Sequence, residues 1–226
     1  MQAENQPRLE PPGFFELVYG ILFDPVKTFG RIAGKPPLGS VFIVFTLVRL
    51  LSTLVGGYIL LEFMSGSLAD IYGLNPGDRL RLVIPLLALG ALIFAYLKWF
   101  FYSGLLHLVG EFFGGRGSSV GVLSVTGLAS LPALLFLPFR ILAAVFGGSK
   151  VYDITSFIIW LVVLVWGVIL VVIGLMETQR LSAERAVATV FAPVIGMVAL
   201  GVFILFIVAF IIIPLSVAPM AKMMGQ

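Results

Sequence analysis

The 226-residue sequence contains no cysteine, one histidine and few charged residues. The absence of cysteine excludes disulfide bonds, thiolate catalysis and cysteine-ligated metals. Charged residues make up 11% of the chain, against about 25% in an ordinary soluble domain. The formal net charge of +3 is too small to indicate nucleic-acid binding. Hydrophobic residues make up 60%, so most side chains must contact lipid or other helices.

The sequence also lacks the motifs of common enzyme classes. It has no phosphate-binding glycine loop, no histidine-glutamate metalloprotease motif, no serine in a nucleophile elbow and no paired acidic cluster. His107 and Glu111 are four residues apart, so a helix would place both on one face as two possible metal ligands. A metal site needs a third ligand from elsewhere, and a solvated helix end is the preferred interpretation. We therefore expect no catalytic residue, no metal site, no cofactor and no enzymatic activity.

Five long apolar stretches dominate the chain. A hydrocarbon core about 30 Å thick needs about 20 apolar residues per helical crossing, and each stretch meets that length. We predict an all-α fold, a polytopic membrane helical bundle of five transmembrane helices preceded by an interfacial amphipathic helix. The predicted crossings are Val41 to Phe63, Leu82 to Leu106, Val120 to Phe146, Ile154 to Met176 and Ala186 to Ile213.

The flanking segments differ from this five-span region, which we place at residues 40–218. Residues 1–39 are interpreted as a tail and interfacial helix without a cleaved signal peptide, and residues 219–226 as a short C-terminal tail. Asp24-Pro25 is a strong helix start, because Asp24 can cap the first amides and Pro25 suits the first helical position. In the helix that follows, the face that we expect to lie in the membrane surface carries Val26, Phe29, Ile32 and Ala33.

The distribution of Lys and Arg predicts the orientation, since cytoplasmic loops retain these residues. Seven lie on the N-terminal side of the bilayer and four on the other side, and three fall within spans. We therefore expect a multi-pass protein of the inner cell membrane, with a cytoplasmic N-terminus and an external C-terminus. The cytoplasmic side chains that we expect to contact anionic headgroups or a partner are Lys27, Arg31, Lys35, Arg180 and Arg185.

Arg49 is the charge that most needs an explanation, because it lies near the bilayer midplane. An unpaired arginine there costs about 2.5 to 3.5 kcal/mol, so Arg49 should face the bundle interior or water. Thr46, Ser52 and Thr53 share its side of the helix and complete a candidate intramembrane polar site. Two interpretations remain open: a polar cavity that contacts a ligand or headgroup, and a structural donor to the carbonyls of a neighbouring helix.

Two further cations and two prolines lie within the spans. Lys98 and Arg140 fall close enough to the membrane surfaces to be anchors that reach the headgroups, and Trp99 fits an interfacial aromatic belt. Pro132 and Pro138 loosen the third span. Such a break lines the substrate site in some transporters, but we expect a simple kink.

The run from Leu22 through Asp24-Pro25 and Phe29 to Lys35-Pro36-Pro37 resembles the entry segment of prokaryotic members of the Yip domain family. The stretch from Gly174-Leu175 through Leu181-Ser182-Ala183-Glu184-Arg185-Ala186 is similar to the loop before that family's last helix. The resemblance extends from about Phe14 to Phe210. It implies a helical membrane adaptor or scaffold. In the eukaryotic branch it implies binding of prenylated small GTPases, but the Asp-Leu-Tyr-Gly-Pro signature of that branch is absent here.

The sequence thus favours a non-catalytic membrane scaffold or adaptor of the Yip type. It would act by binding lipid, a membrane protein or a second copy of the chain, and not by binding nucleic acid. The alternative is a small transporter or permease component with a polar pathway near Arg49.

Overall fold

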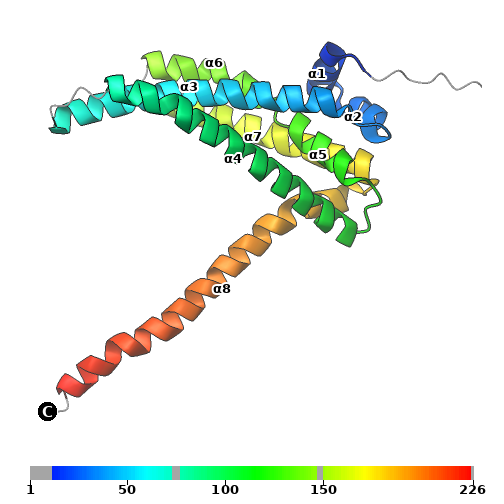
Figure 1. Ribbon diagram of the computed structural model, residues 1–226. Coiled ribbons are helices and arrows are strands. Elements are labelled where there is room, and N and C mark those ends of the chain that lie inside the picture. Colours follow the sequence, from blue (N-terminus) through cyan, green and yellow to red (C-terminus); the bar gives the residue numbers. More distant parts are fainter. Residues whose placement is uncertain (1–11, 73–76, 147–149, 225–226) are drawn as a thin grey trace, which may run out of the picture.

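The computed structural model describes residues 12–72, 77–146 and 150–224 of the chain, with side chains described over 12–59, 85–142, 146, 151 and 154–210. Every regular element in these residues is a helix, which confirms the all-α prediction (Figure 1). The helices are α1 (Phe14–Phe23), α2 (Pro25–Ala33), α3 (Leu38–Tyr72), α4 (Gly77–Phe112), α5 (Ser119–Leu128), α6 (Ala133–Phe146), α7 (Lys150–Gln179) and α8 (Ala183–Met224).

Five segments are long and apolar enough to cross a membrane, as the sequence predicted. They are Leu38–Ile59, Pro85–Phe112, Ser119–Leu142, Ile154–Gln179 and Ala183–Phe210. The first crossing was predicted to end at Phe63 and the second to begin at Leu82, but both helices are longer than these crossings. Helix α3 continues to Tyr72 and α4 begins at Gly77, and residues 73–76 lie outside the described part. At 1.5 Å per residue, helices of 35 and 36 residues extend beyond a hydrocarbon core about 30 Å thick.

The third span is interrupted, whereas the sequence analysis favoured a kink. Helix α5 ends at Leu128 and α6 begins at Ala133. Pro132 has no amide hydrogen to donate to the carbonyl four residues earlier, that of Leu128. Instead, Leu131 N donates to the Leu128 carbonyl at 3.0 Å, and the next amides also form three-residue bonds. Pro132 therefore falls at a true break, while Pro138 is accommodated inside α6.

The centre of the bundle is packed around the aromatic rings of α3 and α4. The rings of Phe45 and Trp99 stack with their centroids 4.2 Å apart. Trp99 Nε1 donates a hydrogen bond to Thr126 Oγ1 at 3.0 Å, and Ser103 Oγ lies 2.6 Å from the same oxygen. Trp99 is 4% exposed. The prediction that Trp99 belongs to an interfacial belt was therefore wrong.

Helices α1 and α2 lie at one end of the bundle, beside the α4–α5 connection and the turn between α7 and α8 (Figure 1). We call this the α1 end. Helix α2 packs against α7, and this contact buries Phe29 and Ile32. The apolar face of α2 was predicted to lie in the membrane surface. This prediction was wrong for most of the face, because other helices of the protein cover it. Val26, assigned to the same face, is 52% exposed.

The start of α2 is where the sequence predicted it, but its cap is different. Pro25 occupies the first turn, and Asp24 precedes the helix without a side-chain hydrogen bond to its amides. The Asp24 carboxylate instead pairs with Lys27 Nζ at 2.9 Å. A carboxylate shared with a lysine one turn later still lies at the positive end of the helix, where it is stabilising.

Helix α8 leaves the bundle after its first turns. Ala186, Thr189 and Val190 are buried, and the helix there packs against α4 and α7. From Val194 to Phe210 every residue is exposed, and Figure 1 shows α8 diverging from the other helices. The helix continues through Pro193 without interruption. A bilayer would supply the apolar environment that this surface lacks in the isolated chain.

Candidate functional site

Arg49 projects from the middle of α3 with its hydrogen-bonding capacity unused. Its Nε is buried, and no partner for it is present in the described part of the chain. Its guanidinium carbon lies 5.0 Å from the centroid of the Phe45 ring, which is a cation–π contact. Such a contact stabilises the charge but satisfies none of its N–H donors, so Arg49 retains donors for a further group.

The polar neighbours predicted for Arg49 do not form a site with it. The Thr46 hydroxyl donates to the Phe42 carbonyl at 2.6 Å and is hydrogen-bonded to the Tyr96 hydroxyl. Ser52 and Thr53 are half-buried and, like Thr46, are not among the residues around the cavity beside Arg49. On the face of α3 that carries these residues, Thr46 contacts Tyr96 of α4.

A cavity of about 430 Å³ lies beside Arg49 and is lined by residues of α3, α4, α5, α7 and α8 and of the α5–α6 connection. This volume is within the usual range for small-molecule sites, about 300 to 1,000 Å³. The wall is mostly apolar, with polar groups from several helices. The residues that line it are Phe45, Arg49, Ala95, Lys98, Trp99, Tyr102, Thr126, Ala129, Ser130, Leu164, Gly167, Val168, Val171 and Val190.

Lys98 is a site residue that sequence reasoning missed. We expected it to be a surface anchor because of its depth along α4, yet it lines the same cavity as Arg49. Arg140, the other expected anchor, lies against α3: a Cβ built at Gly56 would be 3.5 Å from one of its guanidinium nitrogens. Two cations that line one cavity are unusual at membrane depth. The sequence places Lys98 near Tyr96 and next to Trp99. The depth of Lys98 along its helix does not reveal which neighbouring helix its side chain faces.

The break in the third span forms part of the cavity wall. Ala129 and Ser130, which follow α5, line the cavity together with Thr126. Gly167 on α7 lies next to this break, and a Cβ at this position would make an ordinary van der Waals contact, 3.5 Å from the Ala129 carbonyl oxygen. The packed layer of Phe45, Trp99 and Thr126 lies on the wall towards the core. Residues of the break therefore line the cavity.

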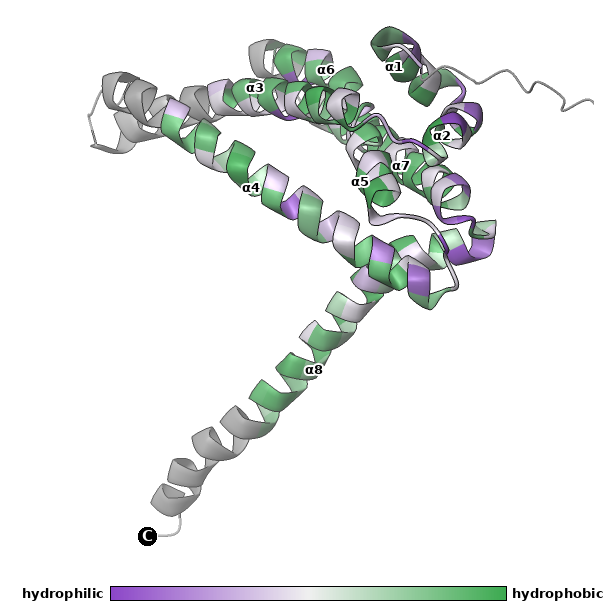
Figure 2. Cartoon of the chain, turned by 45° about the vertical axis from the view of Figure 1, so that its right-hand side comes forward, coloured by the Kyte–Doolittle hydropathy of each residue, from purple (hydrophilic) through white to green (hydrophobic). Residues whose placement is uncertain are grey.

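A second feature is the set of exposed basic side chains at the α1 end. It comprises Lys27, Arg31 and Lys35 near α2, Arg116 in the α4–α5 connection, and Arg180 and Arg185 at the α7–α8 turn. Figure 2 shows hydrophilic residues gathered at this end of the bundle. All five side chains predicted to contact headgroups or a partner thus lie at one end.

Two of these cations have acidic partners at the α1 end. Arg31 bonds the carboxylate of Glu16 on α1, and this bond lowers the pKa of Glu16 from its ordinary value. The hydrogen bond from Lys27 to Asp24 raises the pKa of Lys27. Exposed pairs of this kind are weak because water screens their attraction, so a phosphate group can compete for the same cations.

The sole histidine joins α4 to α7 near the α1 end. His107 Nδ1 lies 2.8 Å from Gln179 Nε2, and His107 Nε2 lies 3.4 Å from a Glu111 carboxylate oxygen. Within the residues that the structure describes, no group of three potential metal ligands occurs. Of the pair that we had weighed as metal ligands, His107 contacts Gln179 of α7, and Glu111 contacts His107 within α4.

Comparison with known proteins gives one match. Residues 19–213 match the family model of the Yip1 domain. No curated protein matches the chain, and no solved structure matches it either.

Proposed function

We propose that this chain, which belongs to the Yip1 domain family, is a membrane scaffold or adaptor that acts by binding rather than by catalysis. It is a multi-pass membrane protein, and its family generally comprises non-catalytic proteins of membrane trafficking. The observation that supports the proposal best is the convergence of exposed cations from α2, the α4–α5 connection and the α7–α8 turn at the α1 end. A surface assembled from three separate chain segments suits recognition of a partner or of anionic headgroups.

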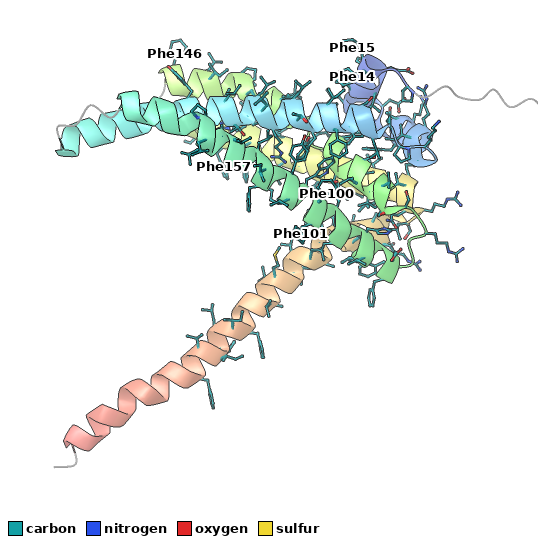
Figure 3. The ribbon with its side chains drawn as sticks, in the orientation of Figure 1. Phe14, Phe15, Phe100, Phe101, Phe146 and Phe157 are labelled. Carbon is teal, nitrogen blue, oxygen red and sulfur yellow. The ribbon has the colours of Figure 1, made fainter. Side chains whose placement is uncertain are left out.

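Helix α1 adds an apolar component to this surface. Phe15, Tyr19 and Phe23 follow each other at four-residue spacing and are 84%, 66% and 70% exposed. The opposite face of α1 packs into the core through Leu17 and Ile21. Figure 3 shows Phe14 and Phe15 on α1, remote from Phe146 and Phe157. An exposed aromatic stripe next to cations is typical of a helix at the headgroup boundary, so α1 is the better candidate for the interfacial helix.

Partner binding can be tested with the full-length protein in native membranes. Crosslinking followed by affinity purification should recover a partner with the wild type and lose it when Lys35, Arg180 and Arg185 are all replaced with glutamine. Lys150→Gln, at the start of α7, is the matched control and should retain the partner. Equal recovery from the triple variant and the wild type would contradict a role for these cations.

The proposed placement follows from the same surface. We place the α1 end in the cytoplasm of a prokaryotic cell and the protein in the inner membrane, because the basic side chains gather at this end. The partner classes that fit are anionic lipid headgroups, an acidic surface of a membrane protein, and a second copy of the chain. A nucleic-acid partner is not part of the proposal.

A small transporter or permease component is the second candidate. The observation that favours it is the cavity beside Arg49, which includes the break in the third span as part of its wall. Broken helices next to a midplane charge line substrate sites in transporters. Solute flux into vesicles containing the purified protein, abolished by Arg49→Ala and retained by Lys27→Gln, would rank this candidate first. Absence of flux for anionic solutes in the wild type would remove it.

A further inference from the structure

The cavity beside Arg49 carries more positive charge than its surroundings neutralise. Arg49 and Lys98 both line it, and none of the described residues around it is acidic. The described acidic side chains, Glu16, Asp24, Glu111, Glu177 and Glu184, belong to the α1 end or its vicinity. Burying a cation without a partner is costly, so a bound anion would remove a penalty that the chain alone leaves in place.

The backbone around the cavity does not supply the missing partner for Arg49. Arg49 needs acceptors, and at the break in the third span the Ser130 carbonyl already accepts from Ala133 N at 3.1 Å. The Ser130 hydroxyl donates to the Gly127 carbonyl at 2.6 Å. The Thr126 hydroxyl is occupied by Trp99 and Ser103. Arg49 and Lys98 are therefore the groups that set the charge preference of the cavity.

The position of the cavity favours an occupant from the bilayer. Every residue around it belongs to a membrane-spanning segment, and most of the wall is apolar. Tyr102 and Leu164, from α4 and α7, are about two-fifths exposed, at 38% and 42%. Both helices are long enough to contact acyl chains on their outer faces. A lipid can enter sideways between them, with its charged headgroup at the cations and its tails along the apolar wall.

We propose that this cavity binds the anionic headgroup of a membrane lipid, with Arg49 and Lys98 as the charged contacts. The shared chemistry is a phosphodiester or carboxylate joined to an apolar tail. Guanidinium binds such groups through two parallel N–H donors, which matches the unused capacity of Arg49. Lys98 adds a second point charge. The site lies in the middle of the spans and does not depend on the proposed role of the α1 end.

The test measures contact between lipid and Trp99, which lines the cavity. The chain has three tryptophans, so Trp160→Phe and Trp166→Phe leave Trp99 as the sole fluorophore. The full-length protein is placed in bilayers of unlabelled phosphatidylcholine. Brominated phosphatidylglycerol and brominated phosphatidylcholine, each with bromine on the acyl chains, are then titrated separately over the same range of mole fractions. We expect the anionic lipid to quench Trp99 at a mole fraction roughly tenfold lower than the zwitterionic lipid.

The variants assign the effect to the two cations. Lys98→Gln and Arg49→Gln should each weaken the preference roughly tenfold, because one lost charge-assisted hydrogen bond corresponds to about a factor of ten. Arg49→Lys should keep part of it, and Lys27→Gln at the α1 end should leave it unchanged. If Arg49→Gln fails to fold, Lys98→Gln and Arg49→Lys still decide the question, since Lys98 is exposed and lysine retains the charge.

Three results would overturn the assignment. The first is equal quenching by both lipids in the wild type. The second is an undiminished anionic preference in Arg49→Gln/Lys98→Gln. The third is loss of the preference when millimolar inorganic phosphate or glycerol phosphate is added, because a soluble anion would then be the occupant. A failed partner-recovery experiment at the α1 end would leave all three readings unaffected.

Discussion

At the residue scale, buried hydroxyl groups join spans of the bundle. Thr126 Oγ1 accepts from Trp99 Nε1 at 3.0 Å and lies 2.6 Å from Ser103 Oγ, so one side chain of α5 satisfies two of α4. Thr126→Val keeps the shape but leaves the indole N–H buried without a partner. We expect a loss of about 1 to 3 kcal/mol in unfolding free energy, measured by denaturant titration in detergent.

Thr155→Val is the matched control for that substitution. Thr155 lies on α7 and bonds the Val151 carbonyl of its own helix at 2.8 Å in an exposed position. Its loss should change stability by less than about 0.5 kcal/mol. Equal effects of the two variants would mean that the Trp99–Thr126–Ser103 contact contributes nothing beyond an ordinary helical hydroxyl.

Gly117 permits the α4–α5 connection to cross the end of α7. A Cβ at this position would lie 2.1 Å from the Thr178 carbonyl oxygen, and backbone cannot move aside as a flexible side chain can. Gly117→Ala should therefore lower the unfolding free energy by about 1 to 3 kcal/mol. Gly104→Ala, where nothing lies within 4 Å, should be neutral or slightly stabilising. Thermal denaturation of both variants measures the difference, and equal midpoints would contradict the close crossing.

At the scale of elements, the contact between α1 and α2 should depend on pH. Arg31 on α2 bonds Glu16 on α1 and lowers the pKa of that carboxyl. A group whose folded pKa is lowered contributes stability above its ordinary pKa and loses it as the pH falls through the folded value. Hydrogen exchange of the α1 amides should therefore accelerate as the pH falls below about 4, after correction for the intrinsic rate.

Glu16→Gln should remove that pH dependence, because glutamine keeps the shape but does not titrate. Its α1 exchange should be as fast at neutral pH as that of the wild type in acid. Lys27 provides the contrast, because its pair with Asp24 lies within one helical turn and joins no other helix. Lys27→Gln should leave α1 exchange unchanged. An acid-insensitive α1 in the wild type would show that the Leu17 and Ile21 contacts hold it without the ion pair.

Several element boundaries could be predicted because their causes are local. Pro25 marks the first turn of α2, and Ser182 precedes α8 at Ala183. The extension of α3 and α4 beyond the membrane was missed, because hydropathy reports the length in contact with lipid and not where a helix ends. From the sequence, both a kink and a break were considered at Pro132. A break forms here because the Leu131 and Ala133 amides donate to carbonyls three residues earlier, which the sequence does not reveal.

At the scale of the whole molecule, five crossings were predictable and the cavity was not. A span that is apolar all round carries little signal about which face meets which neighbour. Arg49 was identified from its depth alone. Arg49 and Lys98 line the same cavity because of the way α3 and α4 are rotated against each other. The packing of Phe45 on Trp99 fixes this rotation. The predicted site was therefore limited to residues that share the Arg49 face of the helix, whereas the cavity is also lined by residues of the four other membrane-spanning segments.

An odd number of crossings requires the α1 end and the end of α8 to lie on opposite sides of the membrane. The chain has no cysteine, so single cysteines report accessibility without background. Arg116→Cys and Arg180→Cys, both at the α1 end, should react with a membrane-impermeant maleimide only after the membrane is opened. Met224→Cys, at the end of α8, should react in intact cells. Val198→Cys, within the exposed apolar part of α8, should react poorly in both states because lipid surrounds it.

The pattern of labelling separates three topologies. If the cysteines at the α1 end react in intact cells and Met224→Cys reacts only after opening, the protein has five crossings in the opposite orientation. The basic surface would then face outwards, against the usual retention of cations in the cytoplasm. Labelling of Arg116→Cys and Met224→Cys from the same side would require an even number of crossings. Helix α8 would then fail to cross, and its exposed apolar surface would have to be covered by protein. With an even number of crossings and a cytoplasmic α1 end, none of the three variants should react in intact cells. Met224→Cys, Arg116→Cys and Arg180→Cys should then all react after the membrane is opened.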